Sequence, residues 1–153
     1  MFKKLALVMA CAISAAMFFT GCSEESSSGS SSSSSSGSSS SSSSKIDQSS
    51  IKGVTKTLIN ALINKDEDTL WAILAPDLKK EAIEKYDSEA KAKEDTCKLF
   101  FALISDQSIA DNMKKVMRED EEGAINRFID GCGGEDSYEE IDGKWYYKGN
   151  SNN

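Results

Sequence analysis

The sequence of 153 residues contains no histidine. Histidine is the commonest general base, the base of protease triads and the commonest transition-metal ligand. Its absence excludes most hydrolase designs and most transition-metal sites. Phosphate-binding loops and dinucleotide-binding glycine motifs are absent as well. We therefore expect a protein that is not an enzyme and that needs no cofactor.

Positive charge is also scarce in this chain. Its 18 Lys and Arg residues face 25 Asp and Glu residues, and the formal net charge of -7 becomes -9 if Lys3 and Lys4 are removed with a leader. Such a surface is repelled by nucleic acid, and no basic patch with interleaved aromatic residues occurs. We expect no nucleic-acid partner. The acidic surface suits a cationic partner or serves solubility alone.

Residues 1–21 have the three-part layout of an export signal. A cationic start over residues 1–4 precedes an uncharged run from Leu5 to Phe19, and small residues lead up to Cys22. The run of 15 residues spans about 22 Å as a helix, which is short of the ~30 Å hydrocarbon core of a bilayer. We therefore predict a cleaved signal peptide rather than a permanent transmembrane helix.

The segment Phe19-Thr20-Gly21-Cys22 resembles the lipobox of bacterial lipoproteins, in which an aliphatic residue, a small residue and Gly or Ala precede a Cys. The resemblance implies a diacylglycerol on Cys22, cleavage between Gly21 and Cys22 by the lipoprotein signal peptidase, and acylation of the new amino group, for example with palmitate. Two or three acyl chains hold a protein stably on a lipid bilayer. We expect a membrane lipoprotein of the bacterial cell envelope; the alternative is ordinary secretory cleavage near Cys22.

The residues after Cys22 indicate which membrane carries the protein and how far the domain lies from that membrane. Ser23 differs from the Asp of an inner-membrane retention signal, which favours the outer membrane, and the pair Glu24-Glu25 is similar to export tags of surface-displayed lipoproteins. The protein would then lie on the periplasmic face or at the cell surface. Of residues 23–44, 18 are serine, so residues 22–44 predict a lipidated Cys with a disordered tether. As a coil the tether spans about 26 Å.

Residues 45–153 are the part of the chain that can fold, as one small acidic domain. Apolar residues recur at helical spacing from Ile51 to Ile129, with interruptions at residues 65–68, before Pro76 and near Ser88. The pattern predicts five or six helices packed as a small bundle. Residues 97–104 are apolar nearly all round, so we expect them to form the central buried element. Helix starts are marked by candidate caps: Asp47 or Ser50, Asp66 or Asp68, and Ser88.

The last element changes character to a β-hairpin. Asp142-Gly143 suits a two-residue turn between strands at residues 138–141 and 144–148. The fold class is therefore mainly α (α+β), with a bundle and a C-terminal hairpin. One face of the hairpin carries Tyr138, Glu140, Trp145 and Tyr147, and the other carries Glu139, Ile141, Lys144 and Tyr146. The aromatic residues either hold the hairpin on the core or form a ligand platform for a protein or polysaccharide: Tyr138, Trp145, Tyr146 and Tyr147.

Part of this layout is similar to secreted members of the NTF2-like, cystatin-like superfamily. The similarity lies in the helix followed by residues 64–66, the short helix with Leu70-Trp71 that ends at Pro76, and residues 141–146. It covers about a third of the domain. It implies an α+β fold with a curved sheet of four or more strands around a pocket. We keep this fold as the alternative, because the region from Ser88 to Ile129 has helical spacing.

Cys97 and Cys132 are the two thiols that remain in the domain once Cys11 leaves with the signal. In an oxidising compartment such a pair is expected to form a disulfide, which would stabilise the domain by roughly 4 kcal/mol. The alternatives are two free buried thiols or a redox role. A redox role is disfavoured because the CxxC spacing is absent.

Residues 119–142 contain ten carboxylates and a single cation, Arg127. Clustered carboxylates are required by a calcium site or by a glycosidase pair. A calcium loop starting at Asp130 would place Cys132 and Gly134 where oxygen ligands are needed, and Ile141 at its twelfth position. We therefore assign no metal ligand and no catalytic residue, and we interpret the charges as solvated loop and capping residues.

These observations favour a membrane-anchored lipoprotein that serves as a non-catalytic binding or interaction module of the cell envelope. One alternative is a small-molecule pocket protein or minor enzyme of NTF2-like fold. Another is an inhibitor or immunity-type protein whose acidic face binds a basic partner.

Overall fold

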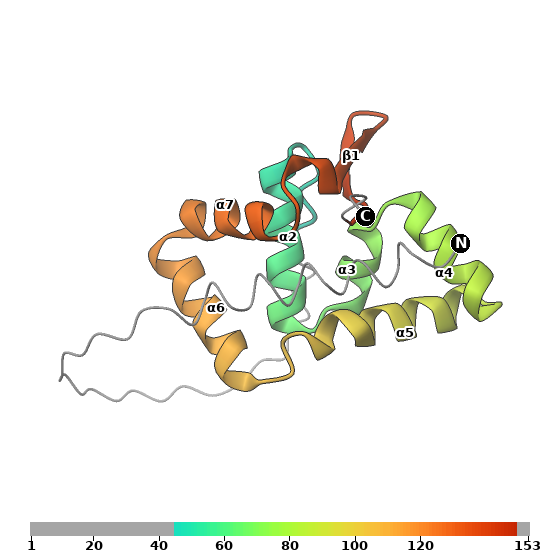
Figure 1. Cartoon of the computed structure of the whole chain (residues 1–153), viewed down its shortest axis with the longest axis horizontal. Coiled ribbons are helices and arrows are strands. Elements are labelled where there is room, and N and C mark those ends of the chain that lie inside the picture. The colour runs from blue at the N-terminus through green and yellow to red at the C-terminus, as the bar shows by residue number, and fades with distance from the viewer. Residues whose placement is uncertain (1–44, 150–153) are drawn as a thin grey trace.

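The computed structural model describes residues 45–149 of the chain. The predicted signal peptide, the lipobox-like segment with Cys22 and the predicted serine tether lie outside these residues. Six α-helices, one 3-10 helix and one two-stranded sheet make up the described part (Figure 1). This confirms the mainly helical α+β class with a C-terminal hairpin. Between residues 45 and 149, no helix is long and apolar enough to cross a membrane.

The helices are short, and local signals in the sequence determine where several of them begin. They are α2 (Ile51–Asn64), α3 (Glu67–Ile73), α4 (Pro76–Tyr86), α5 (Glu89–Ala102), α6 (Gln107–Glu119) and α7 (Glu121–Gly131). Ser50 caps α2 by accepting a hydrogen bond from Gly53 N, and Asp66 caps α3 by accepting one from Thr69 N, each at 3.0 Å. Pro76 takes the first position of α4, where its missing N–H has no helical partner to lose.

Helix α2 lies at the centre of the bundle (Figure 1) and contacts α3, α6, α7 and strand β2. Its side chains Val54, Leu58 and Ile59 are at most 1% exposed. The buried positions of α2 extend well beyond one stripe. A helix that is covered on most of its circumference is the core of the bundle.

The prediction that residues 97–104 form the central element is wrong. Helix α5 packs mainly on α3 and α4 and runs along the lower edge of the molecule in Figure 1. Leu99, Phe101 and Leu103 remain half-buried. A helix at the edge of a bundle is covered on one side only, so an apolar run does not by itself identify the central helix.

The C-terminal hairpin has the predicted turn and register. It consists of η1 (Glu135–Ser137), β1 (Tyr138–Ile141) and β2 (Lys144–Tyr147). Asp142 and Gly143 have φ values of 52° and 74°, as a two-residue primed turn requires. Tyr138 pairs with Tyr147 across the antiparallel strands, which confirms the predicted division of the two faces.

The NTF2-like alternative is wrong for the described part of the chain. Residues 45–149 contain one sheet of two strands, whereas that fold needs a curved sheet of four or more. The region that would have to supply the missing strands forms α5, α6 and α7. Its apolar residues recur at helical spacing, and Ser88 caps α5 by accepting a hydrogen bond from Lys91 N at 3.2 Å.

Candidate binding site at the hairpin end

Two of the four residues predicted as a ligand platform belong to the core. Tyr138 and Tyr147 are 3% and 2% exposed, and their rings meet edge to face with centroids 5.4 Å apart. Tyr147 also meets Phe100 of α5 at 6.3 Å. Rings buried this deeply cannot contact a ligand. The platform prediction is therefore wrong for these two residues, and their role as the packing face of the hairpin is confirmed.

The buried hydroxyl of Tyr138 has a partner on α2. It lies 2.8 Å from Thr55 Oγ1, which in turn donates to Ile51 O at 2.8 Å. Burial raises the pKa of Tyr138 above its ordinary value, although the hydrogen bond with Thr55 acts in the opposite direction. The hydroxyl therefore stays neutral and serves as a structural link between the hairpin and α2.

Trp145 and Tyr146 are the two aromatic residues of the hairpin that remain accessible. Both are half-buried. Trp145 packs against the core, and Tyr146 lies on the opposite face of β2. Two rings on opposite faces of a strand cannot stack on the same sugar ring. The structure therefore does not bring the predicted residues together as one platform.

The outer edge of β2 is covered by two other segments of the chain. Trp145 N donates to Gln48 O at 2.9 Å, and Gln48 Nε2 donates to Trp145 O at 3.0 Å. Ala75 N donates to Tyr147 O at 2.8 Å. These bonds fix the hairpin on the bundle. Sequence reasoning did not single out Gln48, because one polar residue before a helix carries no pattern.

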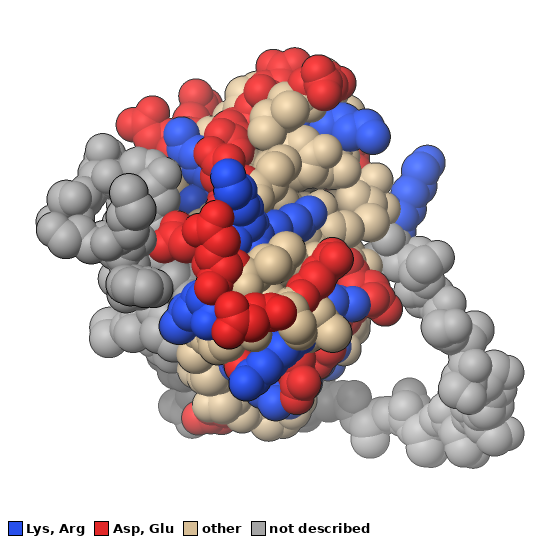
Figure 2. Space-filling model, turned by 90° about the vertical axis from the view of Figure 1, so that its right-hand side faces the viewer, with Lys and Arg blue, Asp and Glu red and all other residues tan. Residues whose placement is uncertain are grey.

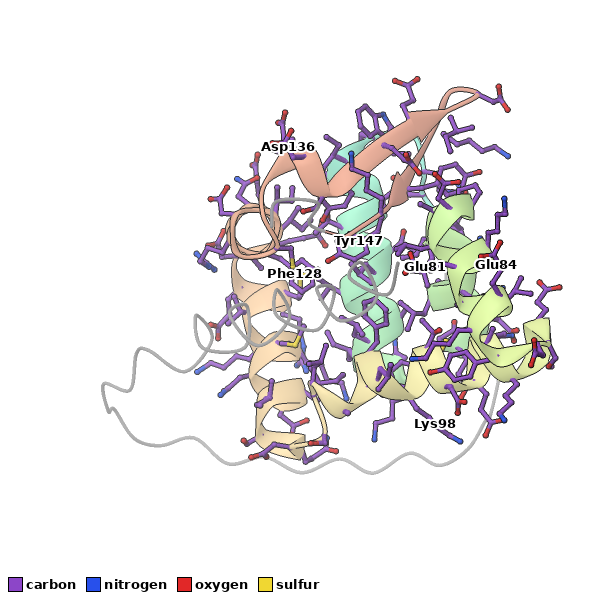
Figure 3. All side chains as sticks on the ribbon, turned by 45° about the vertical axis from the view of Figure 1, so that its right-hand side comes forward. Glu81, Glu84, Lys98, Phe128, Asp136 and Tyr147 are labelled. Carbon is purple, nitrogen blue, oxygen red and sulfur yellow. The ribbon has the colours of Figure 1, made fainter. Side chains whose placement is uncertain are left out.

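Six carboxylates lie between the end of α7 and the turn of the hairpin, and we call this group the acidic end. They come from α7, η1, β1 and the turn: Asp130, Glu135, Asp136, Glu139, Glu140 and Asp142. All are exposed except Glu139, which is half-buried. None forms an ion pair with any residue between 45 and 149. Acidic side chains, some of them at the top of the molecule, alternate with basic ones over the face shown in Figure 2, and Asp136 lies on the outer side of the molecule in Figure 3.

Three of the other four carboxylates in residues 119–142 have partners. Two of these ion pairs join α7 to α2, and the third joins the capping residue of α7 to a side chain further along the same helix. The ion pairs are Lys52–Glu122 at 2.7 Å, Lys56–Glu121 at 2.8 Å and Arg127–Asp120 at 3.3 Å. Such exposed pairs contribute little to stability, at most about 1 kcal/mol each. The acidic segment therefore divides into a partly paired group at the start of α7 and the unpaired acidic end.

The described residues form neither a metal-binding site nor a pair of carboxylates suited to acid catalysis. Within residues 45–149, no group of three or more acidic or cysteine side chains could hold a metal ion. Glu81 lies on α4 and is labelled in Figure 3. One oxygen of its carboxylate is buried and lacks a hydrogen-bond partner among the described residues. Sequence reasoning missed this residue. A glycosidase needs two carboxylates across the reacting bond, so Glu81 alone is assigned no chemistry.

The structure shows no disulfide between Cys97 and Cys132, the pair predicted from the sequence, and both side chains are buried. Cys97 Sγ lies 3.6 Å from Glu67 O, where α5 meets α3. Cys132 follows α7, and its carbonyl accepts a hydrogen bond from Ser137 Oγ. In the view of Figure 1, α2 lies between α5 and α7. Spacing in the sequence does not determine whether two sulfur atoms can meet, so the sequence alone does not fix this pairing.

The absence of a disulfide between Cys97 and Cys132 leads to a chemical prediction. Burial raises the pKa of Cys97 to about 12, with the carboxylate of Glu67 acting in the same direction. The thiolate is the reactive form, so a covered and protonated thiol does not react. We expect iodoacetamide to modify neither cysteine of the folded domain near neutral pH, and both in concentrated urea without reductant. Mass spectrometry counts the adducts.

A parallel sample that is reduced before alkylation in urea is the control for this experiment. Equal adduct counts with and without reduction would agree with the absence of a disulfide. If Cys97 and Cys132 react in urea only after reduction, the two residues are bonded in the isolated protein, and the structure without this disulfide is contradicted.

No protein-family model, curated protein or solved structure matches this chain.

Proposed function

We propose that this protein is a lipid-anchored, non-catalytic binding module of the bacterial cell envelope. In this proposal acylated Cys22 holds the chain on the outer membrane, and the acidic end binds a cationic protein partner. The motif at residues 19–22 supports the anchor. One observation supports the partner: the six carboxylates of the acidic end, all between residues 130 and 142, form no ion pair among residues 45–149.

The physical case for a cationic partner combines charge and rigidity. Grouped carboxylates create a negative potential that steers a positively charged surface toward them. One exposed ion pair contributes at most about 1 kcal/mol, so binding needs several contacts at once. Hydrogen bonds to Gln48 and Ala75 hold the hairpin in place before binding. A preformed surface loses little conformational entropy when a partner docks.

A polysaccharide ligand has less support than a protein ligand. Stacking on sugar rings needs exposed aromatic faces that act together. In this hairpin Tyr138 and Tyr147 are buried, and Trp145 and Tyr146 lie on opposite faces. We therefore commit to a basic protein surface as the partner.

Capture from an envelope extract of the producing organism tests this function. The full chain would be compared with a variant that neutralises the acidic end: Glu135→Gln, Asp136→Asn, Glu139→Gln and Glu140→Gln. The matched control neutralises four exposed carboxylates elsewhere: Asp77→Asn, Glu84→Gln, Glu89→Gln and Glu119→Gln. Quantitative mass spectrometry measures the captured proteins at low and at high salt.

We expect the unaltered chain and the control to capture proteins rich in Lys and Arg at low salt, and to release them at high salt. The variant of the acidic end should capture about tenfold less, because four exposed contacts of a few tenths of a kcal/mol each add up to ~1.4 kcal/mol. An equal loss in both variants would mean that net charge alone is responsible and that the acidic end is not the site.

A further inference from the structure

The two edges of the hairpin differ in how their backbone groups are used. In an antiparallel pair, alternate residues direct their N–H and C=O groups away from the partner strand. On β2 these residues are Trp145 and Tyr147, which are bonded to Gln48 and Ala75. The residues opposite them on β1 are Glu140 and Tyr138. The edge of β1 is therefore the edge at which a further strand could be added.

Glu140 presents both of its backbone groups on this edge. Neither its N–H nor its C=O has a hydrogen-bond partner in the part of the chain that the structure describes, and the residue is exposed. Tyr138 N–H donates to Glu135 O, so Tyr138 contributes its C=O alone. Along this edge, the N–H of Glu140 therefore lies between two acceptors, the C=O of Tyr138 and the C=O of Glu140. An antiparallel strand continues such a pattern with one pair of bonds to Glu140 and a further bond to Tyr138 O.

We propose that the edge of β1 binds an extended, cationic segment of the partner protein, which adds a third strand to the hairpin. The inference rests on the proposed function and specifies how the partner binds. Strand addition obtains affinity from backbone hydrogen bonds and specificity from side chains. The side chains that flank this edge are the carboxylates of Glu139, Glu140 and Asp142. Lys or Arg residues of an added strand complement them.

A second copy of this chain does not fit the same edge. Antiparallel pairing of two β1 strands about Glu140 would set this carboxylate opposite its own copy, with Glu139 and Asp142 close by. Like charges directly opposite each other destabilise a strand pair. Charged residues on an exposed edge prevent self-association. The same carboxylates that repel a second copy select a strand of opposite charge.

Two peptides of equal charge test the inference with the full chain. The first is a short capped peptide of alternating lysine and threonine residues. The second has the same sequence, but its central amide nitrogens are methylated, so it cannot donate backbone hydrogen bonds. We expect the first peptide to bind at least about tenfold more tightly, as two or three backbone bonds require. We also expect it to slow hydrogen exchange at the Glu140 amide.

Variants of the full chain separate the edge from the rest of the surface. Glu140→Lys should weaken binding of the unmethylated peptide, whereas Glu84→Gln on α4 should leave it unchanged. Equal binding of both peptides would mean that charge alone holds the partner; this overturns the edge inference and leaves the proposed function standing. Binding of neither peptide, or dimerisation of the chain through this edge, also overturns the inference. The capture experiment judges the proposed function separately.

Discussion

Replacement of Tyr147 by alanine is expected to lower the free energy of unfolding by about 3 to 5 kcal/mol. The side chain is 2% exposed, and its ring packs edge-on against Tyr138 and Phe100. Truncation leaves a cavity that the neighbours fill only in part, and it removes both aromatic contacts. Domains of this size have roughly 5 to 15 kcal/mol of stability in total, so the loss is a large fraction. Urea denaturation followed by tryptophan fluorescence measures it.

The neighbouring tyrosine is a matched control for this substitution. Tyr146 has the same size, lies on the same strand and points to the opposite face, where it is half-buried. We expect Tyr146→Ala to cost less than about 1 kcal/mol, as surface substitutions usually do. Equal losses from Tyr146→Ala and Tyr147→Ala would contradict the assignment of Tyr147 to the core and of Tyr146 to the outer face.

Substitution of Cys22 by alanine is expected to abolish lipid labelling and to move the protein from the membrane fraction to the soluble fraction. The thiol of Cys22 is the proposed site of the diacylglycerol, because it directly follows the lipobox-like segment Phe19-Thr20-Gly21. One acyl chain binds a bilayer weakly, with an association constant of about 10⁴ M⁻¹, whereas two or three chains hold it stably. Metabolic labelling with a palmitate analogue and membrane fractionation measure both effects.

Cys11 is the control for this prediction, because it lies within residues 1–21, the segment that the proposal treats as a cleaved signal. Cys11→Ala should leave labelling and membrane attachment unchanged. Continued labelling of the Cys22→Ala variant would refute lipidation at this residue. A Cys22→Ala chain that stays in the membrane fraction without label would instead indicate that the first 21 residues remain attached as an anchor.

Features of the fold that depend on neighbours in the chain could be predicted from the sequence. Ser50 was one of two candidate caps for α2, and Pro76 marked the start of α4 because of its missing N–H. Asp142 and Gly143 were identified as the turn because they tolerate positive φ. In each of these cases the deciding contact lies within a few residues of the signal.

The acidic end could be predicted only in part. The sequence shows ten carboxylates in residues 119–142, but it does not show which of them have partners. Lys52 and Lys56 of α2 reach Glu122 and Glu121 across 70 and 65 positions of sequence. Such contacts depend on how α2 and α7 pack, so the unpaired group could be recognised only once the fold was known.

The edge of β1 is a second feature that sequence patterns did not reveal. The turn at residues 142–143 predicts two strands but does not say which of them faces another segment. Gln48 comes from 97 positions away to cover Trp145. Because β2 is covered by Gln48 and Ala75, the edge of β1 at Glu140 is left as the accessible one.

By itself the sequence determined the helices, the hairpin and its turn, and it is the sole basis for the proposed anchor at Cys22. The tertiary structure decided that α2 rather than α5 is central, which backbone edge of the hairpin is covered, and which aromatic rings are buried. The physical reason is the range of the interactions. Caps, turns and helical spacing act within a few residues, whereas burial, pairing and edge exposure depend on segments brought together from distant parts of the chain.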